Sequence, residues 1–170
     1  MKTKNLAFVV LLLSVISFGT HAQGQEKVVT VFLYNFAING QWEQKNSDGE
    51  FIIGVLDRGA VSKELQSLAA TKTVGNQKIK IIEFANAAEI KDCHILFIPA
   101  AKSGSLASAS SALASTSTLI VTEKEGLAKK GSGINFITVD GKLRYEMNEA
   151  ELEKRNIKLS TKIKSLGIAI

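Results

Sequence analysis

Five short apolar runs, each bounded by turn-forming residues, limit the fold more than any other feature of this sequence. They are almost continuously hydrophobic, which is typical of strands covered on both faces of a sheet. The runs are residues 51–56, 79–84, 94–98, 119–122 and 134–139, with helix-length segments at 61–70 and 103–115 between them. Because alternating strands and helices form parallel sheets, the sequence predicts a three-layer α/β domain, a mostly parallel sheet of about five strands flanked by helices.

A helix is expected before the first of these strands, over residues 27–37. Its apolar side chains follow the i, i+3, i+4, i+7 spacing of a helix with one buried face. They are Val29, Phe32, Leu33 and Phe36. Asn39-Gly40 then ends the helix, because both residue types favour the chain reversal that follows a helix. The sheet should therefore be preceded by a helix that packs against it.

The end of the chain predicts an antiparallel edge hairpin followed by two short helices. Asp140-Gly141 is a strong hairpin signal that places Val139 opposite Lys142 and therefore Phe136 opposite Tyr145. The charges on the second arm should make it an edge strand that discourages further pairing. Asn148 has the spacing of a helix cap, so a helix should run to about Arg155, and a last helix should span residues 160–166.

The N-terminal segment has the pattern of a secretory signal peptide. Two lysines precede an apolar run at 6–13, and Thr20-His21-Ala22 fits a small-x-small cleavage site. The apolar stretch is too short to span a hydrocarbon core of about 30 Å. The sequence therefore predicts a signal peptide at 1–22, a single domain at 23–170 and a periplasmic location. An uncleaved membrane anchor is the alternative.

Charge and cysteine content argue against nucleic-acid binding and against an internal disulfide. The leader contains two of the 21 basic residues and none of the 16 acidic ones, so the mature net charge is +3. This small, dispersed excess gives little support to nucleic-acid binding. Cys93 is the single cysteine, so no internal disulfide can form. It is expected to be buried, with an intermolecular disulfide as the alternative.

No catalytic or metal-binding set is recognisable. His94 is the one histidine of the mature chain, and its neighbour Cys93 should point to the opposite face of the same strand. Spacings typical of zinc ligands, nucleotide-binding loops and nucleophile elbows are missing from the sequence. We therefore expect no catalytic residue, metal or cofactor, and a structural role for His94.

An open parallel sheet also predicts a binding crevice, since ligands collect at the carboxyl ends of the strands. The residues that follow those ends and could line a crevice are Asp57, Arg58, Lys102, Ser103 and Thr122. The turn at 102–105 could seat an anion with free backbone N–H groups. The sequence thus predicts a small polar ligand here, although ordinary turn residues are the simpler interpretation.

A run of basic residues lies near the end of the chain without an acid among them. It consists of Lys154, Arg155, Lys158, Lys162 and Lys164. The run either forms a solvated helical face or attracts an acidic partner or an anionic lipid surface.

Several blocks of sequence, in order, resemble the YfiR-like family of exported regulatory proteins. They are Val31 to Ala37, Cys93 to Ile98, Gly133 to Phe136, Asp140 to Asn148 and Ile157 to Ile163. Together these blocks are spread over nearly the whole length of residues 26–167. One departure is Asn39 to Glu43, which keeps the family's tryptophan and loses its proline, and another is the lack of the further cysteines tied to redox control in the namesake.

This resemblance implies a periplasmic α/β protein, often a homodimer, that regulates and does not catalyse. The namesake represses a membrane-anchored diguanylate cyclase by binding its periplasmic part, so an inner-membrane cyclase, sensor kinase or other receptor is the expected partner. Candidate contact residues are Tyr34, Asn35, Trp42, Arg144 and Lys162, with Trp42 outside the predicted elements. Tyr34 and Asn35 could equally hold the first helix on the sheet. The alternative function is a periplasmic sensor or carrier of a small ligand.

Overall fold

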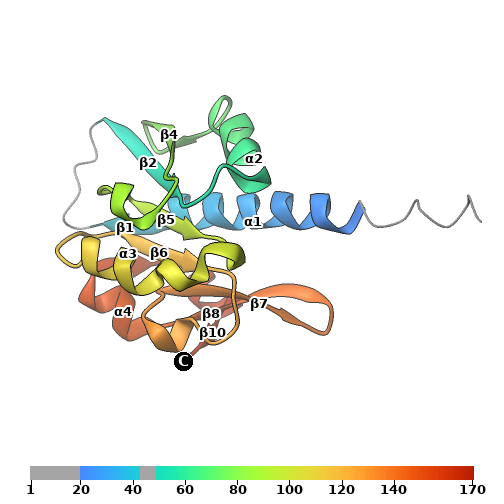
Figure 1. The fold of residues 1–170 in the computed structure, drawn as a ribbon, viewed down its shortest axis with the longest axis vertical. Helices are drawn as coiled ribbons and strands as arrows, with labels where there is room; N and C mark the ends of the chain where they lie inside the picture. The colour runs from blue at the N-terminus through green and yellow to red at the C-terminus, as the bar shows by residue number, and fades with distance from the viewer. Residues whose placement is uncertain (1–19, 43–48) are drawn as a thin grey trace, which may run out of the picture.

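The computed structural model describes residues 20–42 and 49–170, so most of the expected signal peptide lies outside the described residues. Helix α1 (Thr20–Ile38) is the longest element and runs along one face of the main sheet (Figure 1). The other helices are α2 (Ala60–Ala69), α3 (Leu106–Ala112), α4 (Glu149–Lys154) and α5 (Thr161–Leu166), with 3-10 turns η2 (Ala87–Glu89), η3 (Ala100–Ser105) and η4 (Ala128–Lys130).

The main sheet has eight strands in the order β10-β8-β7-β6-β5-β2-β4-β3. The strands are β2 (Glu50–Val55), β3 (Thr73–Val74), β4 (Gln77–Glu83), β5 (Ile95–Ile98), β6 (Leu119–Thr122), β7 (Ile134–Val139), β8 (Lys142–Met147) and β10 (Ile168–Ala169). The five central strands β4, β2, β5, β6 and β7 are parallel. They match the five apolar runs, so the predicted α/β class is confirmed, with more strands than expected.

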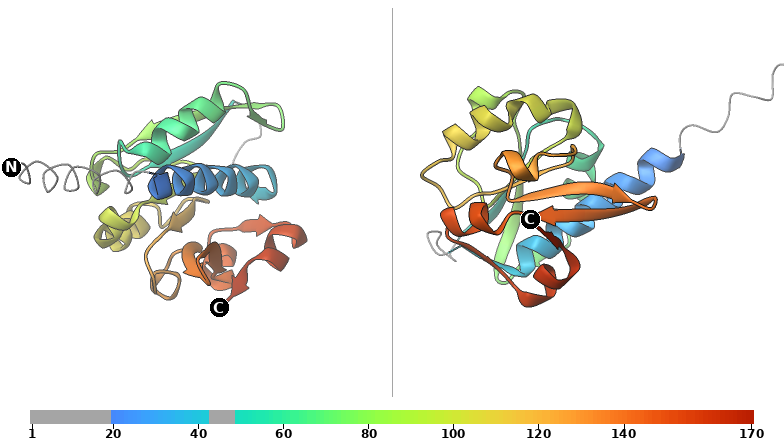
Figure 2. Two further views of the ribbon diagram at one scale, coloured as in Figure 1. Left: turned by 90° about the vertical axis from the view of Figure 1, so that its right-hand side faces the viewer. Right: turned by 90° about the horizontal axis from the view of Figure 1, so that it is seen from below.

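Alternation along the central strands divides the core into two layers. Ile95 and Phe97 of β5 belong to the cluster under α1, whereas Leu96 and Ile98 belong to the cluster under α3. Figure 2 shows helices on both sides of the sheet. Ala109 of α3 is fully buried, and its small side chain lets this Ser/Ala-rich helix lie close to the strands. The predicted segment 103–115 is therefore α-helical over residues 106–112, with its first residues in η3 and its last three in a turn.

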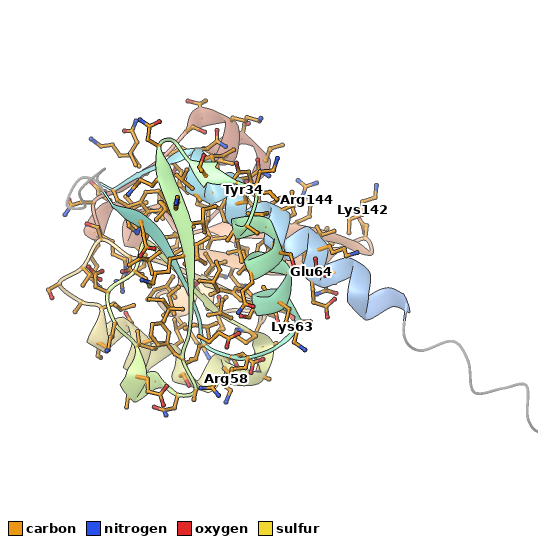
Figure 3. The ribbon with its side chains drawn as sticks, turned by 90° about the horizontal axis from the view of Figure 1, so that it is seen from above. Tyr34, Arg58, Lys63, Glu64, Lys142 and Arg144 are labelled. Carbon is orange, nitrogen blue, oxygen red and sulfur yellow. The ribbon has the colours of Figure 1, made fainter. Side chains whose placement is uncertain are left out.

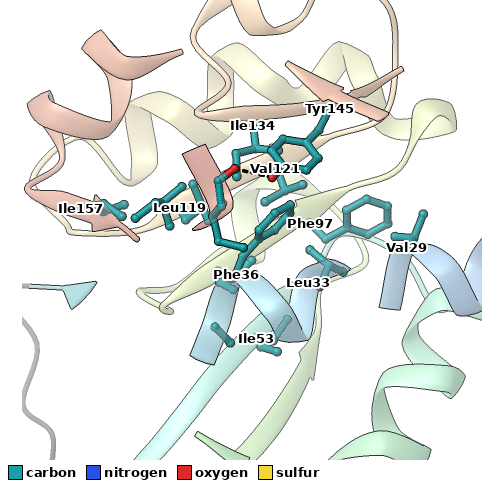
Figure 4. Close-up of a cluster of buried hydrophobic side chains, with 14 of the residues drawn as sticks. Val29, Leu33, Phe36, Ile53, Phe97, Leu119, Val121, Ile134, Tyr145 and Ile157 are labelled. Carbon is teal, nitrogen blue, oxygen red and sulfur yellow. Dashed lines mark hydrogen bonds between the residues drawn. The ribbon is translucent and has the colours of Figure 1, made fainter. Parts of the chain in front are cut away.

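The face of α1 that packs on the sheet carries a cluster of aromatic rings (Figure 4). Phe36 is fully buried, and its ring centroid lies 5.1 Å from that of Tyr145 and 6.1 Å from that of Phe136. The Tyr145 hydroxyl donates a hydrogen bond to the Ile163 carbonyl at 2.6 Å. The helical face predicted from the 3.6-residue period is the buried one, although α1 begins at Thr20, seven residues earlier than expected.

The C-terminal hairpin has the register that the sequence predicts, with Val139 opposite Lys142 and Phe136 opposite Tyr145. Asp140 and Gly141 both have positive φ angles, 50° and 71°, as the two-residue turn requires. The expectation that β8 forms the edge is wrong. Strand β10 pairs with its last two residues, Ile168 with Glu146 and Ala169 with Met147, because alternating charges point to the sheet faces and leave the backbone edge open.

A second, two-stranded sheet was not expected from the sequence. Strand β1 (Gly40–Trp42) pairs antiparallel with β9 (Ile157–Leu159). Trp42 therefore lies in a strand, and the expectation that it falls outside the regular elements is wrong. Its side chain belongs to the core, and its indole N–H donates to the His94 carbonyl at 2.9 Å.

The basic run from Lys154 to Lys164 does not form one solvated face. Arg155 is only 4% exposed, and its guanidinium donates to the Leu113 carbonyl and the Ser110 hydroxyl, both at 2.9 Å. It thereby ties the end of α4 to α3. The capping residue is as predicted, since the Asn148 side chain accepts from the Glu151 N–H at 3.1 Å.

Candidate functional site

A cavity of about 280 Å³ opens at the carboxyl ends of β2, β5 and β6, between the N-terminal parts of α1 and α2. We call it the strand-end cavity. Its polar walls include Glu26 of α1, Asp57 after β2 and Glu123 after β6, and its apolar walls include Val55 and Phe97. The position is the one that an open parallel sheet favours for a ligand.

Only one of the five predicted crevice residues, Asp57, lines this cavity. Thr122 is fully buried, and its hydroxyl donates to the Asn135 side-chain oxygen at 2.7 Å. Side chains alternate between the two faces along β6, and that of Thr122 points toward α3 and away from the cavity. The Arg58 side chain is 73% exposed and lies 4.0 Å from the Glu83 carboxylate. Lys102 and Ser103 belong to η3 and do not line the cavity. The expected anion seat is therefore not part of it.

The charged side chains around the strand-end cavity are all acidic. Burial is the main cause that raises the pKa of Glu123, and the nearby Glu26 carboxylate raises it further, whereas the hydrogen bond from the Ala100 N–H opposes both. That bond joins the Ala100 nitrogen to Glu123 Oε1 at 3.0 Å. Glu26 Oε2 is buried and has no hydrogen-bond partner among the described residues. The cavity thus carries negative charge that the fold does not neutralise.

Replacing Glu123 by glutamine should stabilise the protein at neutral pH. A raised pKa in the folded state means that ionisation of Glu123 opposes folding, a cost that is absent below its ordinary value of 4.5 and grows as the pH rises toward the folded-state pKa. Glutamine can still accept from the Ala100 N–H. We expect Tm to rise by about 1–2 °C at pH 7 and the difference to vanish below pH 4.5.

Thermal unfolding followed by circular dichroism at several pH values would measure this difference, with Glu125→Gln at an exposed neighbouring position as the control. A Tm difference that is independent of pH would contradict the assignment to the Glu123 charge.

His94 has a structural position in the fold. Its Nδ1 accepts the Ile52 backbone N–H at 3.0 Å, and its ring stacks on Phe51 with centroids 4.3 Å apart. Cys93 is buried beside it in the chain. In the described ranges, residues 20–42 and 49–170, no three His, Cys, Asp or Glu side chains are grouped closely enough to hold a metal ion.

A second candidate surface is the side of α1 that faces away from the sheet. Val28, Val31 and Ile38 are 42%, 54% and 45% exposed, and Asn35 lies between them. We call these four residues the α1 stripe. Their spacing of three, four and three residues keeps them on one side of the helix, as in the seam of a coiled coil. The sequence contained this signal, because Val28, Val31 and Ile38 are apolar but lie off the predicted core face.

The predicted contact residues are spread over the molecule and do not form one patch. Tyr34 donates its hydroxyl to the Thr73 carbonyl at 3.2 Å, and the Asn35 amide donates to the Val31 carbonyl at 2.8 Å. Arg144 is exposed on β8, where its neighbour Tyr145 faces α1, so alternation turns Arg144 to the other face of the sheet. Lys162 is exposed on α5.

Figure 3 shows half-buried or exposed side chains on three separate elements. They are Tyr34 on α1, Lys63 and Glu64 on α2, and Lys142 and Arg144 on β8. Of the predicted contact residues, only Asn35 belongs to the α1 stripe, with Tyr34 next to it. Trp42 is buried and is not part of any exposed surface.

No helix in the described part of the chain has the length and the apolar character that a membrane span needs.

Comparison with known proteins places the chain in a family. No curated protein matches the sequence. The model of the YfiR/HmsC-like family, however, matches residues 26–167, which include all the secondary structure from the middle of α1 to the end of α5. The chain therefore belongs to the YfiR/HmsC-like family.

Proposed function

We propose that this protein is a periplasmic regulator that acts by contact, and that it restrains a membrane-anchored signalling protein such as a diguanylate cyclase or a sensor kinase. The family supports this proposal, because YfiR-like proteins are known as periplasmic regulators of signalling and not as catalysts. The partner is bound through its periplasmic part, so regulation needs no chemical step in this protein.

The α1 stripe is the observation that carries the proposal. Three large aliphatic side chains lie exposed on one side of a 19-residue helix whose opposite side is already buried in the core. Such a stripe binds a partner that offers an amphipathic helix with a complementary apolar face. Asn35 lies within the stripe, and a polar residue in an apolar seam selects the register of the partner.

A charge placed in the α1 stripe should weaken partner binding without unfolding the protein. Val31 is the most exposed of its apolar residues, so Val31→Glu should weaken binding about 10–100-fold, as expected for a central interface residue. Its Tm should stay within about 2 °C of the wild type. Val139→Glu at the exposed hairpin tip is the matched control, because it makes the same change on a surface outside the stripe, and it should bind normally.

The partner can be identified by in vivo cross-linking from a photoreactive residue at position 31, with position 139 as control. Recovery of a membrane-anchored signalling protein, together with higher output of that protein in cells carrying Val31→Glu, supports the proposal. Cross-linking to a second copy of this chain would assign the stripe to a homodimer. Recovery of no signalling protein, with unchanged surface attachment on deletion, would overturn the proposal.

A second candidate function, a periplasmic sensor of a small ligand, is favoured by the strand-end cavity. The two functions are compatible, because the cavity is lined by the inner side of α1 at Gln25, Glu26 and Val29, whereas the α1 stripe lies on the outer side of the same helix. A ligand could therefore tune the contact with the partner.

A further inference from the structure

We propose that the strand-end cavity binds an organic cation, a primary ammonium or guanidinium group carried on a short apolar body. The inference rests on the second candidate function, the small-ligand sensor, and names the class of ligand. The turn at 102–105, where the sequence indicated an anion, is not part of this cavity.

The charge of the cavity wall selects a cation. Three carboxylates line it, those of Glu26, Asp57 and Glu123, and no lysine, arginine or histidine is among its lining residues. The nearest arginine in sequence, Arg58, is directed to Glu83. An anionic ligand would meet only charges of its own sign here, although the protein as a whole has a net positive charge of +5.

Hydrogen bonding indicates a donor that the protein itself does not supply. Glu26 Oε2 is buried and has no partner among the described residues, and a buried carboxylate oxygen ordinarily finds a donor. The Ala100 N–H holds Glu123 Oε1 in place at 3.0 Å, so that carboxylate is fixed before a ligand arrives. An ammonium or guanidinium group carries several N–H donors and no acceptor, which matches a wall of carboxylate oxygens.

The remaining walls and the volume define the rest of the ligand. Val29, Val55, Phe97 and Pro99 line the cavity with apolar surface. A volume of about 280 Å³ is at the small end of the range for ligand pockets. An amine with a chain of four or five carbons fits these limits. The acidic residues in the described part of the chain are not grouped as metal ligands, which favours an organic cation.

Binding can be tested with two probes that share one carbon chain and differ in charge, n-butylammonium and butyrate, with agmatine as a guanidinium probe. Isothermal titration calorimetry and thermal shift on the mature protein at low salt would measure binding. At a hundred times its Kd, n-butylammonium should raise Tm by about 5–10 °C, and butyrate should not raise it. Equal effects of the two probes, or no binding of n-butylammonium or agmatine at about 10 mM, would overturn the proposal.

Two substitutions locate the site and separate it from partner binding. Glu123→Gln keeps the shape of the side chain and removes its charge, so it should weaken n-butylammonium binding at least about 10-fold, whereas Glu153→Gln on the exposed face of α4 should not. Unchanged affinity in Glu123→Gln would overturn the assignment. Val31→Glu should bind n-butylammonium normally, so loss of the partner and loss of the cation are distinguishable.

Discussion

Truncation of Phe36 to alanine is expected to lower the free energy of unfolding by about 3–5 kcal/mol. The side chain is fully buried where α1 meets the hairpin, and its ring packs against Phe32, Phe136 and Tyr145. Alanine removes these contacts and leaves a cavity that the neighbouring rings cannot fill. Urea denaturation followed by circular dichroism would measure the loss as a lower transition midpoint.

Phe36→Leu is the matched control, because it keeps most of the apolar volume and should cost about 1.5 kcal/mol or less. The exposed stripe residue Val31 offers a second control, since Val31→Ala should have little effect on stability. If Phe36→Ala unfolded at the same urea concentration as the wild type, the packing of α1 on the hairpin would be wrong.

The second large effect is expected for Trp42→Ala, a loss of about 3–5 kcal/mol. Trp42 is only 9% exposed, and its ring lies 5.1 Å from Phe51 and 5.9 Å from His94. The loss is mainly apolar, because the His94 carbonyl that accepts from the indole also accepts from the Leu119 N–H at 2.9 Å. Trp42→Phe removes the indole N–H and part of the buried ring, so it should cost less than Trp42→Ala, about 1–2 kcal/mol.

Trp42 is the single tryptophan of the chain, so the fluorescence of the wild type reports directly on this site. Its emission should be blue-shifted in the native state and should move to longer wavelength on unfolding. A native emission maximum typical of a solvent-exposed tryptophan, together with an unchanged stability of Trp42→Ala, would show that Trp42 is exposed. That result would contradict the pairing of β1 with β9.

The parts of the fold that sequence could predict depend on signals contained in short segments. The central strands are continuous apolar runs, and the Asp140-Gly141 turn determines every pair of the hairpin because the side-chain period in a strand is two. Asn148 was recognisable as a cap because its partner, the Glu151 N–H, lies three residues away. In each case the deciding interaction is local in sequence.

The parts that sequence could not predict depend on contacts between distant segments. Strands β1 and β9 have three residues each and lie more than a hundred residues apart, so neither has a periodicity to recognise. Strand β10 has two residues. Arg155 belongs to a basic run that resembles a solvated face, and only the approach of α3 reveals acceptors for its guanidinium at Leu113 and Ser110.

The location of the candidate site was predictable from the sequence, but the charge of its walls was not. The strand order placed a cavity at the carboxyl ends of β2, β5 and β6, and Asp57 lines it. A shift of one position along β6 separates Thr122, buried toward α3, from Glu123, which enters the cavity. The acid that α1 contributes, Glu26, could not be assigned to the cavity until the packing of that helix was known.

The position of α1 determines how late part of this fold can form. Phe136 and Tyr145, the aromatic partners of Phe36, lie about a hundred residues later in the sequence. Strand β1, which follows α1, pairs with β9, which lies still later. Contacts over such separations form late, since the intervening chain must first be closed into a loop. A chain that lacks the hairpin can thus cover α1 only with the earlier strands, and the ring of Phe36 is left without two of its aromatic partners.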